Sequence, residues 1–522
     1  MAVLNSSIEK KLWDAADSLR TNSKLKSSEY ATPVLGLVFL RFADYRFSQA
    51  SLVIEKEFEN SRREPSAIDY QRLPGVMYVP PKARYSYLLN LPEGEDIQQA
   101  VIQAMRDIEE ANPKLKDVLY KHYTRVPKDL LLSLLKTFSE IDMQEHNGDT
   151  FGAIYEYFLS KFALSEGQKG GEFFTPITLV QLIVEILEPN KGTILDPACG
   201  SGGMFVQSAK FVNRHSGNAN SDISILGQEN ITDTVRLCKM NLAVHGLEGD
   251  IKEFNTYYQN VHGCYQKMNY IMANPPFNAK GVDKERIKGD KRYPFGIPST
   301  DNANYLWIQE FYSAMKLGAG KAGFVMANSA ADARGSELEI RKKIIQSQAV
   351  DVMISIGSNF FYTVTLPCTL WFFDNHKKKH SRKDTVLFID ARNIYTQIDR
   401  AHREFTPEQI EYIANIVRLY HNKSVETRDG SEAILAECFP DGKYQDIAGL
   451  CKVATIEEIE AQGWSLNPGR YVGTAIEEFD EEGFWETFLA LNSELQSLNS
   501  EAQELEEEIQ KITSQLLGGR FE

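Results

Sequence analysis

The sequence predicts an α/β protein with a seven-stranded, mostly parallel sheet, a helical domain in front of it and a coiled-coil helix behind it. Three observations predict this class. Apolar side chains recur at helical spacing in the first part of the chain, short apolar runs then alternate with helical stretches, and the tail carries a heptad seam. The expected domains are residues 1–148 (helical), 149–395 (sheet), 396–484 (mixed linker and extension) and 485–522 (coiled coil).

The N-terminal region has the spacing of packed helices. Leu12, Ala16 and Leu19 recur at steps of four and three, and residues 32–47 (TPVLGLVFLRFADYRF) are strongly apolar. Such spacing places apolar side chains on one face of a helix, where a neighbouring helix can cover them.

From residue 193 the pattern changes to short apolar runs separated by helix candidates such as 231–245 and 302–317. This alternation is typical of a parallel sheet covered on both faces. The runs are 193–196, 223–229, 250–254, 269–274, 322–328, 350–356 and 368–374. Only residues 357–367 separate the last two, too few for a packed crossover helix, so the final strand is expected to run antiparallel. One more strand-like run, 385–390, closes the region.

The tail carries an apolar seam with alternating steps of three and four. Its members are Phe488, Leu491, Leu495, Leu498, Ala502, Leu505, Ile509, Ile512 and Leu516. This spacing predicts a coiled-coil helix of about four heptads. A single helix cannot bury such a stripe, so a helical partner is expected.

Composition excludes several classes of protein. The net charge is −15, whereas a protein that binds DNA by itself is usually basic. A partner should therefore supply much of any contact with nucleic acid. The six cysteines are scattered without metal-ligand spacing, which indicates reduced thiols in a cytoplasmic protein and no metal site. No apolar run is long enough to cross a membrane.

Two stretches have the character of a ligand cleft. Residues 195–205 (LDPACGSGGMF) place a Gly-rich turn between a strand and a helix, which lets backbone N–H groups approach a ligand. No phosphate-loop lysine follows, and Glu229 ends the next strand, where a carboxylate can accept hydrogen bonds from ribose hydroxyls. Upstream, residues 170–176 (GGEFFTP) predict a helix start with Thr175 as N-cap and Pro176 at the first helical position.

Residues 273–278 (ANPPFN) end an apolar strand with a rigid turn. The exocyclic amine of a nucleobase is a poor nucleophile because its lone pair is delocalised into the ring. The Asn274 side-chain carbonyl and the Pro275 main-chain carbonyl can accept both amine hydrogens, which frees the lone pair for attack on a methyl group. Phe277 can stack on the base. Such a base must be flipped out of the duplex.

In this order, "GEFFTP", "DPACGSGG", Glu229 and "NPPF" resemble amino-group DNA methyltransferases, and more closely the modification subunit of type I restriction–modification systems. The resemblance implies the S-adenosylmethionine-dependent methyltransferase fold and S-adenosyl-L-methionine as methyl donor. By this resemblance the catalytic residues are Asn274, Pro275, Pro276 and Phe277, with Phe277 and Phe361 stacking on the target base. The implied cofactor residues are Glu172, Phe173, Phe174, Thr175, Pro176, Asp196, Ala198, Gly200, Ser201, Gly202, Gly203, Glu229, Asn230 and Asn255.

Two of these assignments keep an alternative. Asn255 stands where the family often has an Asp near the cofactor adenine, and Asp250 is the other candidate for that contact. Phe361 matches an aromatic that the family uses to sandwich the flipped base, and it fits equally the core of a hairpin.

The resemblance implies methyl transfer to the N6 amino group of adenine in double-stranded DNA. N4-cytosine is the alternative target, followed by RNA or protein glutamine, and a scaffold without activity is a further alternative. The implied partners are a separate specificity subunit, a restriction subunit and a second modification subunit. No segment of this chain has the length and regularity of a target-recognition domain, so the DNA sequence that is recognised is not encoded here.

Overall fold

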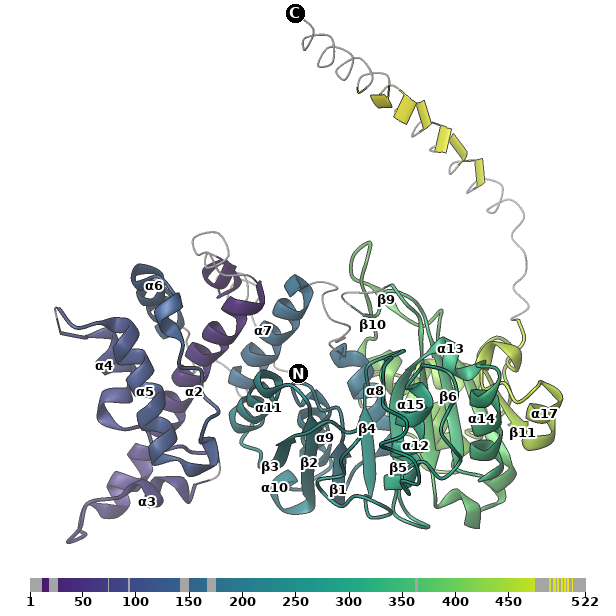
Figure 1. The fold of residues 1–522 in the computed structure, drawn as a ribbon, viewed down its shortest axis with the longest axis horizontal. Coiled ribbons are helices and arrows are strands. Elements are labelled where there is room, and N and C mark those ends of the chain that lie inside the picture. The colour runs from purple at the N-terminus through teal and green to yellow at the C-terminus, as the bar shows by residue number, and fades with distance from the viewer. Residues whose placement is uncertain are drawn as a thin grey trace, which may run out of the picture. The chain divides into compact units, whose positions relative to one another are not determined.

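The computed structural model describes residues 12–17, 27–73, 75–92, 94–140, 150–166, 175–361 and 365–474, and scattered residues between 488 and 509. The chain divides into two units, Met1–Gly473 and Thr474–Glu522, of which the first contains both the helical segment and the sheet (Figure 1).

The helical segment packs around one long central helix, α2. Its helices are α2 (Ser27–Phe58), α3 (Ala67–Gln71), α4 (Tyr85–Leu89), α5 (Ile97–Ala111), α6 (Lys128–Ser139) and α7 (Thr150–Glu166). Residues 34–40 of α2 are apolar apart from Gly36, and their large side chains are buried on all sides, which suits a helix enclosed by others. Leu12 and Ala16 are buried as their spacing predicted, and the Trp13 ring packs on Phe162 of α7 at 5.6 Å.

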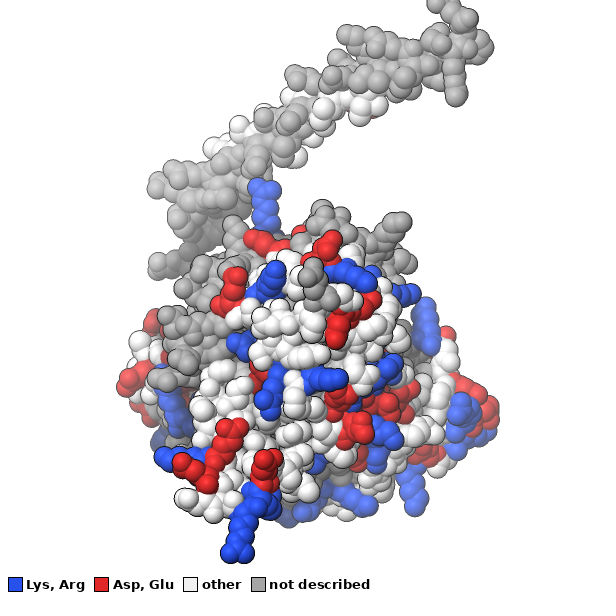
Figure 2. Space-filling view, turned by 90° about the vertical axis from the view of Figure 1, so that its left-hand side faces the viewer, with Lys and Arg blue, Asp and Glu red and all other residues white. Residues whose placement is uncertain are grey.

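The side of the helical segment that carries α3 and α4 bears charges of both signs. Figure 2 shows Lys and Arg interspersed with Asp and Glu over this face. Some are paired: Arg63 lies 2.7 Å from Asp69, and Lys128 lies 2.7 Å from Asp96. Over the residues described on this face, no basic patch suited to a phosphate backbone is apparent.

The second part of this unit is a mixed nine-stranded sheet with the order β11-β8-β6-β7-β5-β4-β1-β2-β3. The strands are β1 (Gly192–Asp196), β2 (Ile223–Glu229), β3 (Gly249–Glu253), β4 (Tyr270–Ala273), β5 (Lys321–Ala327), β6 (Val350–Ile356), β7 (Cys368–Asp374), β8 (Thr385–Asp390) and β11 (Cys451–Thr455). The predicted reversal is confirmed, because β7 lies antiparallel between β5 and β6.

The predicted count of seven strands was wrong. β8, the run that closes the predicted region, pairs parallel to β6 and extends the sheet. β11 then pairs antiparallel to β8 along its full length, although it comes from the segment taken as irregular. β11 is a short edge strand whose five residues (CKVAT) include the polar Lys452 and Thr455. Its sequence therefore lacks the continuous apolar run of the central strands.

Helices cover both faces of the sheet, as the alternation predicted. One face carries α8 (Ile177–Leu187), α9 (Gly203–Arg214), α10 (Ala219–Asp222), α11 (Thr232–Val244), α15 (Pro407–Tyr420) and α16 (Glu432–Cys438). The other carries α12 (Asn304–Ala314), α13 (Asn328–Ala331), α14 (Ser336–Gln346) and α17 (Ile456–Ala461). Met240 and Val244 of α11 belong to the core of the helical segment, so the two parts share buried apolar surface.

Of the second unit, the described residues between 488 and 509 are helical. Phe488, Leu489, Leu495, Leu505 and Ile509 are each at least half exposed. The seam residues Leu491, Leu498, Ile512 and Leu516 lie outside the described residues, so the coiled coil stays a prediction. Among the residues described, no helix is long and apolar enough to cross a membrane, and no group of His, Cys, Asp and Glu forms a metal cluster.

Candidate active site

The candidate site lies at the carboxyl ends of the parallel strands, where the loops after β1, β2, β3 and β4 meet. The register aligns these ends, since Asp196 at the end of β1 pairs with Gly227 of β2, and Glu229 at the end of β2 pairs with Glu253 of β3. Ligands of open α/β sheets bind at this edge. The described parts of all the motifs found in the sequence come together here.

The Gly-rich turn is held rigidly from two sides. Gly202 adopts φ +82°, and a Cβ atom there would lie 2.8 Å from the Cys238 sulfur, so only glycine fits. The Asn241 amide of α11 donates to the Ser201 carbonyl at 2.8 Å, and the Cys199 N–H donates to the Gln228 carbonyl at 3.1 Å. No heavy atom lies within 4 Å of the Cβ positions of Gly200 and Gly203, so the turn faces open space.

Glu229 ties the turn to the end of β2. Its carboxylate accepts the Gly200 N–H at 3.2 Å, the Asn230 N–H at 2.7 Å and the Ile231 N–H at 3.2 Å. These bonds fix the carboxylate at the cleft, and its oxygens have further lone pairs for ribose hydroxyls.

Asp196 has a different character from Glu229. It is 2% exposed, and its carboxyl accepts the Ala198 N–H at 3.0 Å. Burial, assisted by the nearby charge of Glu229, raises the pKa of Asp196 well above its usual range. Asp196 thus lies buried beneath the Gly-rich turn, with its carboxyl bonded to the backbone of that turn.

Two exposed apolar side chains beside Glu229 were not singled out from the sequence. Ile231 is 37% exposed and Phe254 is 41% exposed, and both lie beside Glu229, because the Ile231 N–H donates to its carboxylate and the Phe254 N–H donates to its carbonyl at 2.8 Å. Partly exposed apolar side chains at this strand edge can contact a flat ring. The available signal was an apolar residue just after the end of each of two neighbouring strands.

The structure separates the two candidates for the adenine contact. Asn255 follows the end of β3 and accepts the Tyr257 N–H at 3.0 Å, which places it at the cleft edge. Asp250 lies inside β3 opposite Leu226 and pairs with Lys252 at 3.0 Å and with His262 at 3.4 Å. Asn255 is therefore on the same edge as Glu229, and Asp250 is not.

The N-P-P-F turn is joined to the start of α8. The Asn274 side-chain nitrogen donates to the Thr175 hydroxyl at 2.8 Å, across 99 positions of sequence. This contact corrects the expectation that Thr175 caps α8. Pro176 occupies the cap position, α8 begins at Ile177, and no side chain caps its start. Glu172, Phe173 and Phe174 lie outside the described residues.

A second contact fixes the far end of the same turn. Asn278 adopts φ +54°, and its N–H donates to the Asn304 side-chain oxygen at 2.8 Å. The buried Asn304 amide returns a hydrogen bond to the Asn278 side-chain oxygen at 2.9 Å. This reciprocal pair anchors the turn on α12, and it could not be read from residue order alone.

The two aromatic candidates contact each other. The rings of Phe277 and Phe361 lie 6.1 Å apart at 84°, edge to face. Phe361 is 2% exposed and belongs to the core of the sheet, as the hairpin-core alternative requires. A base stacked between two rings needs them parallel, so Phe361 can join such a stack only after its ring moves.

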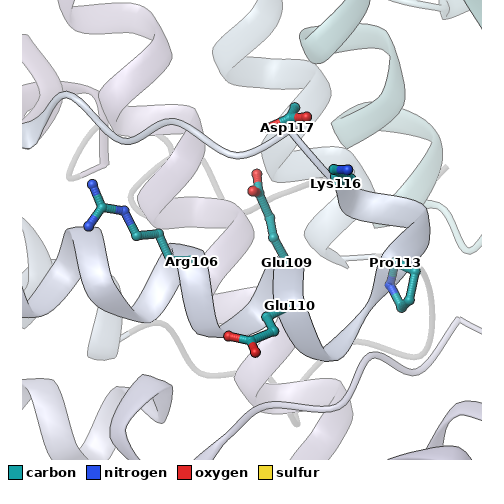
Figure 3. Close-up of a pocket in the computed structure, with 6 residues that line it drawn as sticks. All are labelled: Arg106, Glu109, Glu110, Pro113, Lys116 and Asp117. Atoms are coloured by element: carbon teal, nitrogen blue, oxygen red, sulfur yellow. The ribbon is translucent and has the colours of Figure 1, made fainter.

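A separate hollow of about 340 Å³ lies in the helical segment (Figure 3). It is lined by Arg106, Glu109, Glu110, Pro113, Lys116 and Asp117. Glu109 accepts the Leu119 N–H at 2.7 Å and pairs with Lys121 at 2.5 Å, so this carboxylate is already occupied in holding the segment together. The lining comes from none of the sequence motifs, so the carboxyl edge of the sheet, where those motifs meet, remains the candidate site.

Changing Gly202 to alanine should destabilise the protein. The left-handed backbone costs about 1–2 kcal/mol for a residue with a Cβ, and the Cys238 sulfur leaves no room for that atom. Gly203→Ala is the matched control, because its Cβ meets open space. We expect a lower Tm by calorimetry for Gly202→Ala only, and equal Tm values for the two variants would contradict the described turn.

Comparison with known families agrees with this geometry. A family model described as N-6 DNA Methylase matches residues 146–480, and one described as HsdM N-terminal domain matches residues 8–138. The type I restriction enzyme MjaIX methylase subunit of Methanocaldococcus jannaschii is 38% identical over 502 residues, which cover 91% of this chain and 85% of that protein. The chain belongs to the methylase subunits of type I restriction enzymes.

Other members of this family agree. The type I restriction enzyme HindI methylase subunit of Haemophilus influenzae is 38% identical over 414 residues, covering 77% of this chain and 88% of that protein. A crystal structure of a type I methyltransferase subunit from Streptococcus thermophilus has a TM-score of 0.73 at 22% identity, covering 90% of this chain and 99% of that one. This structure supports the fold. Like its family, the methylase subunit is a site-specific adenine-N6 DNA methyltransferase, and the alternatives of RNA, protein or a scaffold are set aside.

Proposed function

We propose that the carboxyl-edge cleft binds S-adenosylmethionine with its ribose on Glu229, its adenine between Ile231 and Phe254 and beside Asn255, and its methionine end between Gly200 and Thr175. The open space over the Gly-rich turn and the two half-exposed apolar side chains beside a fixed carboxylate fit such a molecule. When bound, this donor supplies an activated methyl group.

The target end of the site is Asn274. Its hydrogen bond to Thr175 directs the amide nitrogen toward the cofactor side and the oxygen away from it. That oxygen and the Pro275 carbonyl accept the two hydrogens of the adenine N6 amine, which draws the nitrogen toward sp³ geometry. With the donor bound, these acceptors would hold the amine with its lone pair free to take the methyl group, and the proton that the nitrogen loses would pass to solvent. Preorganisation of these acceptors lowers the barrier.

One observation carries this proposal: the 2.8 Å contact between Asn274 and Thr175. It joins the motif expected at the target base to the motif expected at the methionine. Donor and acceptor of the methyl group must meet within reacting distance, and this contact brings their two binding elements together.

The partners of this methylase subunit are also proposed. Its net charge of −15 favours a specificity subunit that supplies much of the contact with double-stranded DNA and reads the sequence. A second methylase subunit and a restriction subunit complete the assembly that the family implies. A chain in a solved structure of type I restriction–modification complex assembly has a similar fold, with a TM-score of 0.61 at 17% identity over 97% of this chain and 99% of that one.

The aromatic pair provides a test of the target site. Phe277 is half-buried and packs on the core, so Phe277→Ala should weaken binding of a duplex with a mismatched target adenine by about 1–3 kcal/mol and lower Tm less than Phe361→Ala does. Phe361 is core, so Phe361→Ala should lower stability by about 3–5 kcal/mol. Phe361→Leu keeps most of the volume as a control. If Phe361→Leu binds the mismatched duplex like wild type, Phe361 has no stacking role.

A further inference from the structure

A small hairpin stands beside the target-base site. β9 (Thr396–Gln397) and β10 (Arg403–Glu404) pair antiparallel and lie above the sheet in Figure 1. The Arg403 N–H donates to the Asn359 carbonyl at 2.8 Å, and the ring of Phe405 packs on Phe360 at 4.6 Å. Residues 359–361 therefore carry both the hairpin anchor and Phe361, so the hairpin adjoins the ring that contacts Phe277.

The tip of this hairpin is held by its own hydrogen bonds. The Ile398 N–H donates to the His402 carbonyl at 3.0 Å, and the Ala401 N–H donates to the Asp399 carboxylate at 2.7 Å. The His402 ring nitrogen lies 2.5 Å from the same carboxylate, so the Asp399 carboxylate is paired within the hairpin. The tip thus presents a defined shape to whatever approaches the site.

The tip combines an exposed apolar side chain with charges of both signs, because Asp399 lies between Ile398 and Arg400. Ile398 is 58% exposed, Arg400 is exposed, and the Arg403 guanidinium lies over the Tyr395 ring at 3.8 Å. Leu366, also 52% exposed, comes two residues before β7, which starts at the same edge of the sheet because Cys368 pairs with Ala327 and Ile356. Exposed apolar side chains beside a proposed binding site are available to contact what binds there.

A flipped base leaves a gap in the duplex, and apolar wedges are the side chains that proteins place between base steps. We propose that the hairpin 396–404 contacts the duplex at the target adenine, with Ile398 entering the space that the base vacates and Arg400 meeting a neighbouring phosphate. This inference rests on the proposed function. Double-stranded DNA is the occupant because the hairpin is anchored to the segment whose Phe361 ring contacts Phe277, beside the proposed site of the flipped base.

The test uses the complex of the full chain with its specificity subunit and two duplexes that contain the recognition sequence. In one, the target adenine faces thymine, and in the other it faces an abasic site, which lowers the cost of extrusion. Ile398→Ser should reduce kcat/KM on the paired duplex by about tenfold, a loss of about 1.4 kcal/mol, and match wild type on the abasic duplex. Leu317→Ser is the control, since Leu317 is 66% exposed and precedes β5 at the opposite edge.

Arg400→Ala adds an independent readout. It should raise KM for both duplexes and reduce the salt dependence of binding, because a lost phosphate contact is independent of base pairing. The inference is wrong if Ile398→Ser equals wild type on the paired duplex or loses equally on both. It is also wrong if Ile398→Ser fails to co-purify with the specificity subunit, since the hairpin is then a protein contact. A wild-type complex that methylates no adenine would refute the proposed function and this inference with it.

Discussion

Asn274→Ala is expected to lower methyl transfer by about 10²–10³-fold or more, the usual cost of losing one preorganised group at a reacting centre. S-adenosylmethionine affinity should stay close to wild type, since the Asn274 oxygen is proposed to face the adenine amine and not the cofactor. The side chain is half-buried and its nitrogen is bonded to Thr175, so a modest fall in Tm is also expected. Single-turnover kinetics and calorimetric titration measure the two effects separately.

Thr175→Val is the matched control for this variant. It keeps the shape of the side chain and removes the acceptor of the Asn274 N–H. We expect an intermediate loss of rate, because the amide stays in place but is free to turn its nitrogen toward the base. Wild-type rates for Asn274→Ala would contradict the catalytic assignment, and wild-type rates for Thr175→Val would show that the contact does not orient the amide.

Deleting residues from 490 onward is expected to abolish stable binding to the specificity subunit, and sequence-specific methylation with it. The cleft lies entirely within Met1–Gly473, so the shortened chain should still fold and bind S-adenosylmethionine. Leu495, Leu505 and Ile509 are each more than half exposed, and the cost of leaving such a stripe in water favours a helical partner.

Point variants test the apolar seam more specifically than the deletion does. Leu495→Glu with Leu505→Glu places charge on the seam, whereas Gln496→Glu with Gln503→Glu places the same charge on exposed helical positions beside it. Only the Leu495→Glu, Leu505→Glu variant should fail to elute as a complex with the specificity subunit in size-exclusion chromatography. Undiminished co-purification of the truncated chain would show that the stripe does not bind the specificity subunit.

Much of the sheet and the cleft could be predicted from the sequence because their signals are local. Buried central strands are continuous apolar runs, and the Gly-rich turn and the N-P-P-F turn need particular residues for their backbone shape. Elements with few apolar residues were missed for the same reason. β11 lies at the sheet edge, and β9 and β10 span two residues each. None of these three strands carries a periodic apolar pattern.

Side-chain partners were harder to predict than strands. Thr175 has the sequence context of a helix cap, and only the fold reveals that Asn274, 99 residues away, uses its hydroxyl. Ile231 and Phe254 are ordinary apolar residues in sequence and become cleft residues because the register of β2 and β3 brings them to Glu229. Phe361 shows the reverse, since its family position suggested a base contact and the fold also buries its ring.

The central claim is methyl transfer to the adenine amine held by Asn274. The most direct measurement incubates the complex of this chain and its specificity subunit with duplex DNA and S-adenosylmethionine that carries an isotopically labelled methyl group, followed by digestion to nucleosides and mass spectrometry. The account predicts labelled N6-methyladenine with the wild-type chain and almost none with Asn274→Ala. Label in N4-methylcytosine, or equal N6-methyladenine from both chains, would contradict it.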